Sequence, residues 1–116
     1  MADTSDSRAM IADLHGLAGR LVDLRSLLAE LAVASLTEEG CESFRVLQAE
    51  DSTEIVLLSA WKDETALRGH YDTPHYRHYR AQVGPLLARP SDVTVLHVSE
   101  TIHALDPNAP DPSLFD

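Results

Sequence analysis

Glu54-Ile55-Val56-Leu57-Leu58-Ser59-Ala60-Trp61 carries the strongest strand signal in this sequence. Apolar residues occupy both its odd and its even positions, so both faces of the strand are apolar, and β-branched residues near its start favour an extended backbone. The preceding Asp51-Ser52-Thr53 predicts a turn, and Cys41–Glu50 predicts a strand before that turn. The two strands are therefore expected to form a hairpin.

A helix is predicted upstream of the hairpin, from Arg20 to Ser35. Its leucines recur at helical spacing, at positions 21, 24, 28 and 31, while charged residues take the opposite side. Gly40 is placed to supply a left-handed residue after this helix. Before the helix, the short apolar segment Ala9–His15 predicts the first strand.

A second helical region is predicted downstream of the hairpin. Asp63 is placed to cap its start, and Pro74 is suited to be the first residue of a renewed helix that continues through Val83. Ala88–Asp92 then predicts a loop, and Val93–His103 alternates like a long final strand.

The order β-α-β-β-α-β predicts an α+β fold, the ferredoxin-like sandwich with both helices on one face of an antiparallel sheet. Because Val56 and Leu58 would leave the other face apolar, we expect a homodimer packed sheet to sheet. Residues 9–103 form the predicted domain, preceded by a disordered leader over residues 1–8. A Pro/Asp-rich C-terminal tail is predicted over residues 104–116.

The composition excludes several classes of function. The net charge is −10, and nucleic acids and anionic membrane surfaces require basic patches, so neither is an expected partner. No apolar run reaches the ~20 residues that span a bilayer. The N-terminus is acidic and polar, unlike a signal peptide, and Cys41 is the one cysteine. These features predict a cytoplasmic location.

Candidate site residues cluster in Gly69–Arg80, which contains three of the six histidines and all three tyrosines. Histidine titrates near neutral pH, so His70 and His75 are candidate bases. Tyr76 or Tyr79 can offer a hydroxyl, Trp61 an indole N–H, and Arg80 a charge for a developing oxyanion, although each of these side chains could equally serve packing. His70, His75 and His78 are too loosely spaced to predict a metal site.

The sequence resembles the antibiotic biosynthesis monooxygenase family. The resemblance is carried by Gly40-Cys41, by Ile55–Trp61 continuing into Lys62–His70, by Thr73-Pro74-His75-Tyr76 and by Gly84-Pro85-Leu86-Leu87. It spans about Met10 to Val98, and it implies a dimeric α+β barrel with a cavity between sheet and helices in each protomer. Members include cofactor-free oxygenases of anthrones and quinols, heme-degrading enzymes and non-oxygenases, so the resemblance predicts fold better than reaction.

The resemblance implies a cofactor-independent monooxygenase that uses dioxygen to oxidise an aromatic phenolic, quinol or anthrone-like substrate. Trp61, His70, His75, Tyr79 and Arg80 are its candidate catalytic residues, and neither a cofactor nor a metal is expected. The first strand lacks the asparagine of the heme-degrading members, and Leu57 stands where anthrone oxygenases are expected to have one. A non-catalytic ligand-binding dimer and a non-oxidative acid–base enzyme such as an isomerase are the alternatives.

Overall fold

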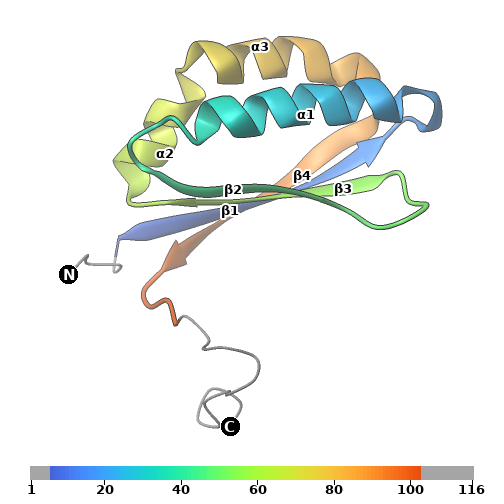
Figure 1. Cartoon of the computed structure of the whole chain (residues 1–116). Coiled ribbons are helices and arrows are strands. Elements are labelled where there is room, and N and C mark those ends of the chain that lie inside the picture. Colours follow the sequence, from blue (N-terminus) through green and yellow to red (C-terminus); the bar gives the residue numbers. More distant parts are fainter. Residues whose placement is uncertain (1–5, 103–116) are drawn as a thin grey trace, which may run out of the picture.

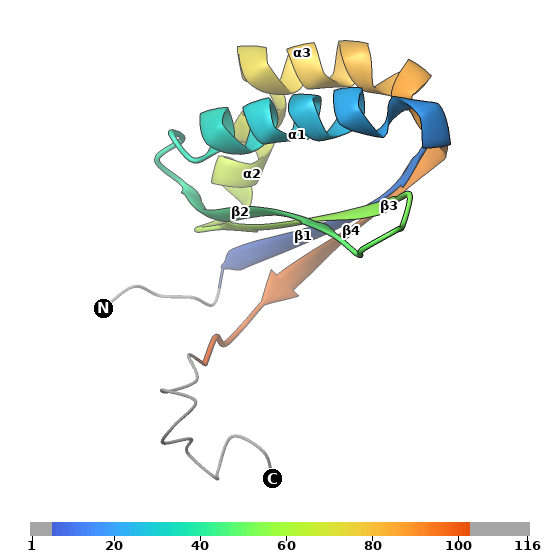
Figure 2. The ribbon, with the colours of Figure 1, turned by 45° about the vertical axis from the view of Figure 1, so that its right-hand side comes forward.

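A computed structural model describes residues 6–102 of the chain. The elements are β1 (Ser7–Gly16), a 3₁₀ turn (Ala18–Arg20), α1 (Leu21–Ser35), β2 (Cys41–Gln48), β3 (Glu54–Trp61), α2 (Glu64–Tyr71), α3 (Pro74–Val83), a second 3₁₀ turn (Gly84–Leu86) and β4 (Leu87–Val98). The four strands form one antiparallel sheet in the order β2-β3-β1-β4. The three helices lie on one face of this sheet (Figures 1 and 2), which confirms the predicted ferredoxin-like α+β fold.

The core lies between this sheet face and the helices. Alternate residues of β1 and β3 point into it, and α1 contributes a row of leucines. Its fully enclosed apolar residues are Leu14, Leu24, Leu28, Ile55 and Trp61. The other sheet face carries no helix, and there Val56 and Leu58 are half-buried while Leu47 and Leu96 are exposed.

The predicted bounds of the first and last strands need correction. β1 begins at Ser7, inside the predicted leader, and Ala88–Asp92 belongs to β4 although a loop was expected there. Pro90 is compatible with this strand because β4 is at the edge of the sheet and Pro90 falls at an irregularity in its pairing with β1, between the pairs Asp13–Asp92 and His15–Arg89. The predicted tail, residues 1–5 of the leader and His103 lie outside the described residues.

Gly40 does not have the predicted left-handed conformation, since no glycine in the described residues has a positive φ. Its role is close packing, because a Cβ at this position would lie 2.3 Å from the Cβ of Ala66 in α2. Among the described residues, Asp51 has a positive φ, of 58°, in the turn between β2 and β3. Gly40 therefore brings the end of the α1–β2 connection directly against α2.

The longest described helix, α1, has 15 residues, and none of the helices over residues 6–102 has the length and apolar character needed to cross a membrane.

Candidate functional site

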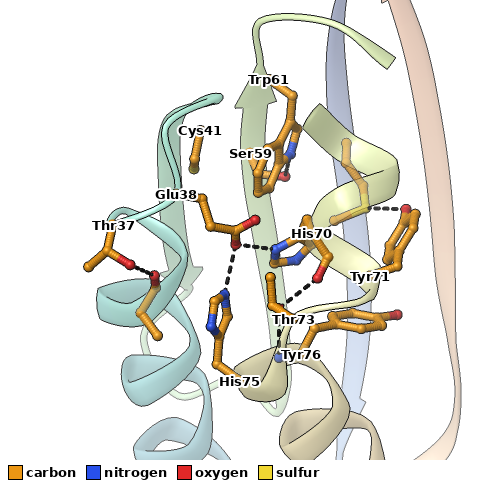
Figure 3. A network of polar contacts seen from close by, with 12 residues as sticks. Thr37, Glu38, Cys41, Ser59, Trp61, His70, Tyr71, Thr73, His75 and Tyr76 are labelled. Carbon is orange, nitrogen blue, oxygen red and sulfur yellow. Dashed lines mark hydrogen bonds and ion pairs between the residues drawn. The ribbon is translucent and has the colours of Figure 1, made fainter. Parts of the chain in front are cut away.

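The candidate site is built around a carboxylate and two histidines. Glu38, in the turn after α1, places its Oε2 2.7 Å from Nδ1 of His70 in α2 and 2.7 Å from Nε2 of His75 in α3. Figure 3 shows Glu38 between the two rings, with both contacts meeting at a single oxygen. We call these three residues the Glu38 cluster. They come from three different segments, so only the tertiary fold brings them together.

The junction of α2 and α3 sets the positions of the two histidines. Asp63 caps α2 by accepting from the Ala66 N–H at 2.7 Å, as predicted. Thr73 caps α3 by accepting from the Tyr76 N–H, and its hydroxyl donates to the carbonyl of His70 at 2.7 Å. Pro74 occupies the first turn of α3 as predicted. The threonine therefore ties the end of α2 to the start of α3 and holds both histidines toward Glu38.

His70 is fully buried and packed among rings. Its centroid lies 4.5 Å from that of Trp61 and 5.1 Å from that of Tyr76. Burial lowers the pKa of His70, and the hydrogen bond to Glu38 opposes this shift without cancelling it. His70 is therefore neutral at physiological pH.

The neutral ring of His70 has a defined tautomer. An ionised carboxylate only accepts hydrogen bonds, so Nδ1 carries the proton that His70 donates to Glu38. Nε2 then holds a lone pair, and this atom is buried with no hydrogen-bond partner among the described residues. A buried acceptor without a partner is rare in folded proteins and indicates a functional position.

A cavity of about 60 Å³ adjoins His70 on the side of the sheet. It is lined by apolar residues of the sheet and α1 and by the three tyrosines: Met10, Ala12, Leu31, Phe44, Leu57, Val93, Tyr71, Tyr76 and Tyr79, together with His70. Burial raises the pKa of Tyr79 to about 12, and it also raises the pKa of Tyr71. Both hydroxyls therefore stay protonated, as hydrogen-bond donors need to be.

A larger groove, of about 320 Å³, lies between α1 and α3, and we call it the α1–α3 groove. Its apolar residues include Leu27, Leu31 and Tyr79, and His75 and His78 also line it. Because Leu31 and Tyr79 line this groove as well as the cavity, the two spaces lie on either side of these side chains. His75 thus borders the groove, whereas His70 borders the cavity.

Two of the predicted site residues do not line the cavity. The indole N–H of Trp61 donates to the Ser59 hydroxyl at 3.0 Å, and Trp61 is a core residue that does not line the cavity. Arg80 is exposed and also does not line it, because one residue after Tyr79 a helix has turned by about 100°. Of the predicted site residues, His70 and Tyr79 line the cavity, His75 contacts Glu38 beside it, and Trp61 packs against the His70 ring without lining it.

Glu38 was missed in the sequence because Thr37–Gly40 has the composition of an ordinary solvated turn. In the structure the side chain of Glu38 is 15% exposed, whereas that of its neighbour Glu39 is 94% exposed. Nothing in the pair of adjacent glutamates indicates which one turns inward.

Among residues 6–102, the Glu38 cluster is the one group of histidine, cysteine or acidic side chains that could hold a metal ion. Its three possible ligand atoms, two histidine nitrogens and a carboxylate oxygen, all lie within 4.8 Å of one another. Two histidines and a carboxylate suit zinc or iron. Both nitrogens, however, approach the same oxygen at 2.7 Å, which is a hydrogen-bond distance, so the atoms already satisfy one another. We therefore describe the cluster as hydrogen-bonded.

Comparison with known proteins gives consistent matches. Residues 9–82 match the family model described as Antibiotic biosynthesis monooxygenase. "Putative monooxygenase Rv0793" of Mycobacterium tuberculosis is 44% identical over 73 residues, which are 63% of this chain and 72% of that protein. "Putative monooxygenase YcnE" of Bacillus subtilis is 35% identical over 68 residues, 57% of this chain and 70% of that protein.

Solved structures agree with this result. The structure of Rv0793 superposes with a TM-score of 0.80 at 36% identity, and the match covers 84% of this chain and all of that one (100%). A structure from Nitrosomonas europaea, described as a "Putative antibiotic biosynthesis monooxygenase", has a TM-score of 0.77 at 22% identity, over 81% of this chain and 91% of that one. At that identity the second match supports the fold alone.

Proposed function

Because the chain belongs to the antibiotic biosynthesis monooxygenase family, we propose that it is a cofactor-independent monooxygenase of an aromatic phenolic, quinol or anthrone-like substrate. His70 is the general base in this proposal, and the hydroxyls of Tyr76 and Tyr79 are the donors that stabilise the substrate anion. One observation carries the proposal. Nε2 of His70 is buried and has no hydrogen-bond partner among the described residues, and the His70 side chain lines a cavity together with three tyrosines.

The proposed reaction needs only a base and an enclosed site. His70 Nε2 takes the proton of a phenolic or enolic O–H, and the resulting anion gives one electron to dioxygen. The substrate radical and superoxide then combine to form a C–O bond, the peroxide anion takes back the proton held by His70, and the resulting hydroperoxide loses water to leave a carbonyl. For an anthrone, the reacting CH₂ carbon loses two hydrogens and gains one oxygen atom, while the second oxygen atom leaves as water.

The size of the cavity sets a condition on this proposal. At about 60 Å³ it has room for on the order of two water molecules, whereas a cavity that holds benzene measures about 150 Å³. An aromatic substrate therefore requires the cavity to widen. We place this widening at Val93 of β4, since this wall residue is 56% exposed and lies on an edge strand.

A second copy of the chain is the partner we propose for the open face of the sheet. Helices cover only the opposite face (Figure 2), and the open face presents Ile11, Val56 and Leu58 at its centre with Leu47 and Leu96 beside them. Apolar side chains on two adjacent central strands are typical of a face that packs against another sheet.

Oxygen uptake by metal-stripped protein, offered a panel of anthrones, naphthols and hydroquinones, tests the proposed activity. We expect saturable uptake above autoxidation, and a loss of about 10²–10⁴-fold in the rate for His70→Gln. His78→Gln is the matched control, because His78 is exposed on α3 and outside the Glu38 cluster. Equal rates for the two variants would refute His70 as the base. No uptake with any compound would favour a ligand-binding protein or a non-oxidative acid–base enzyme.

A further inference from the structure

We infer that Glu38 is the positioning residue of this site, and that through one carboxylate oxygen it couples the protonation of buried His70 to that of His75 in the α1–α3 groove. The inference deepens the proposed function, because it explains how His70 would be kept ready as a base. It concerns the resting protein, however, and can be tested without any substrate.

The first part of the inference follows from the geometry of the contacts. Oε2 of Glu38 receives two hydrogen bonds of 2.7 Å, one from each histidine, so each ring presents a protonated nitrogen to it. For His70 this fixes the proton on Nδ1 and leaves the lone pair on Nε2. Among residues 6–102, Glu38 is the hydrogen-bond partner of Nδ1, so its removal would no longer favour this tautomer over the one with a protonated Nε2, whose Nε2 could not act as a base.

The second part follows from the unequal exposure of the two rings. His70 is fully buried, whereas the side chain of His75 is 22% exposed and borders the groove. The titratable side chains in contact with His70 are Glu38, His75, Tyr71 and Tyr76; Tyr79 lines the same cavity, and Cys41 interacts electrostatically with Glu38. Among these only Glu38 supplies a negative charge at neutral pH, so one carboxylate serves two potential cations.

One negative charge between two imidazoles makes their titrations interdependent. When His70 takes a proton, its new charge disfavours a charge on His75, whose ring centroid lies 5.9 Å away. The two rings therefore respond to pH as a pair, through Glu38, and not independently.

Nitrogen-15 NMR of the histidine side chains tests the inference. In the unmodified protein at neutral pH, we expect His70 to show a protonated Nδ1 and an unprotonated Nε2. Glu38→Gln should shift the titration of His70 to lower pH, because it removes the charge that favours the imidazolium. His75→Gln should shift it to higher pH, because it removes a competing positive charge. His78→Gln, which lines the same groove as His75 but lies outside the Glu38 cluster, should leave it unchanged.

Three results would overturn the inference. The first is a His70 ring protonated on Nε2 in the unmodified protein, a measurement that needs no variant and so does not depend on how a variant folds. The second is a His70 titration that moves in neither Glu38→Gln nor His75→Gln. The third is stoichiometric binding of added Zn²⁺ with loss of the Nδ1 proton, which would make the cluster a metal site.

The NMR result and the oxygen-uptake result separate the two proposals. An Nδ1-protonated His70 in a protein that consumes no oxygen would support Glu38 as the positioning residue and would contradict the monooxygenase. Oxygen uptake by a protein whose His70 carries its proton on Nε2 would support a monooxygenase and would contradict the role of Glu38.

Discussion

Replacing Gly40 by alanine should destabilise the protein, because the added methyl group would overlap α2. The new Cβ would lie 2.3 Å from the Cβ of Ala66 and 3.5 Å from both the Cα of Ala66 and Cε of Lys62. The backbone cannot easily move away, since the carbonyl of Gly40 accepts a hydrogen bond from the Lys62 N–H at 2.9 Å. Either α2 or the turn that carries Glu38 must therefore shift.

The size of the effect follows from two opposing contributions. Overpacking of this kind costs about 1–3 kcal/mol. Gly40 does not have a positive φ, so alanine is allowed there and gains about 0.4–1 kcal/mol from the lower entropy of the unfolded chain. We expect a net loss of about 1–2 kcal/mol, which lowers the melting temperature of a domain of this size by about 4–16 °C.

Urea denaturation measures this loss, and the chain offers a matched control. Gly69 lies inside α2 with no atom within 4 Å of the position of its absent Cβ, so Gly69→Ala should stabilise the protein by about 0.5–1 kcal/mol. Ala66→Gly removes the methyl group that Gly40→Ala would strike. The double variant should therefore show a favourable coupling energy of about 0.5–3 kcal/mol relative to the sum of the single variants.

Two outcomes would refute this reasoning. One is a Gly40→Ala protein as stable as the unmodified one, and the other is strict additivity of Gly40→Ala with Ala66→Gly. The variant also bears on the site, because Glu38 lies in one of the two segments that can move and His70 lies in the other. We expect the hydrogen bond from His70 to Glu38 to weaken in Gly40→Ala and to recover in the double variant, as read from the Nδ1 proton of His70.

Three further predictions concern other parts of the molecule. The hydrogen bond to Asp92 is the main cause that raises the pKa of His15 above its ordinary 6.5. The stabilising effect of protonated His15 is therefore fully present below pH 6.5 and is lost as the pH rises through the folded-state pKa. In urea titrations, His15→Gln should cost more stability at about pH 5.5 than at about pH 8, and an equal cost would contradict this. In sedimentation velocity, Leu58→Arg on the open sheet face should abolish the proposed dimer, while Val22→Arg, at an exposed position of α1, should leave it intact. Burial raises the pKa of Cys41 to about 11, so its alkylation by iodoacetamide at about pH 8 should be slow and should accelerate when urea unfolds the protein.

The local signals in the sequence were accurate where the physics is local. Asp63 and the Thr73-Pro74 pair start their helices as predicted, because a cap acts on backbone groups only two or three residues away. The prediction failed at β4, whose first residues include Pro90 and have a loop-like composition. There the pairing with β1 determines the structure, and the paired residues, such as His15 and Arg89, are more than 70 positions apart in the chain.

The candidate site divides in the same way. The density of histidine and tyrosine in residues 69–80 predicted the segment that supplies His70, His75 and three tyrosines to the candidate site, since few cores need so many titratable aromatic groups. Which of those side chains turn inward was beyond the pattern. Arg80 faces solvent one residue after Tyr79 lines the cavity, and the N–H of Trp61 is already used by Ser59.

The sequence by itself determined the order of strands and helices, the α+β class and the segment in which chemistry is expected, because periodicity, caps and turn residues act over short distances. Tertiary structure decided that Glu38 rather than Glu39 faces the histidines, and that His70 is buried while His75 reaches the groove. It also decided the tautomer of His70. These properties depend on the approach of three segments to one another, and the close packing of Gly40 against Ala66 that brings them together is a contact between residues distant in the chain.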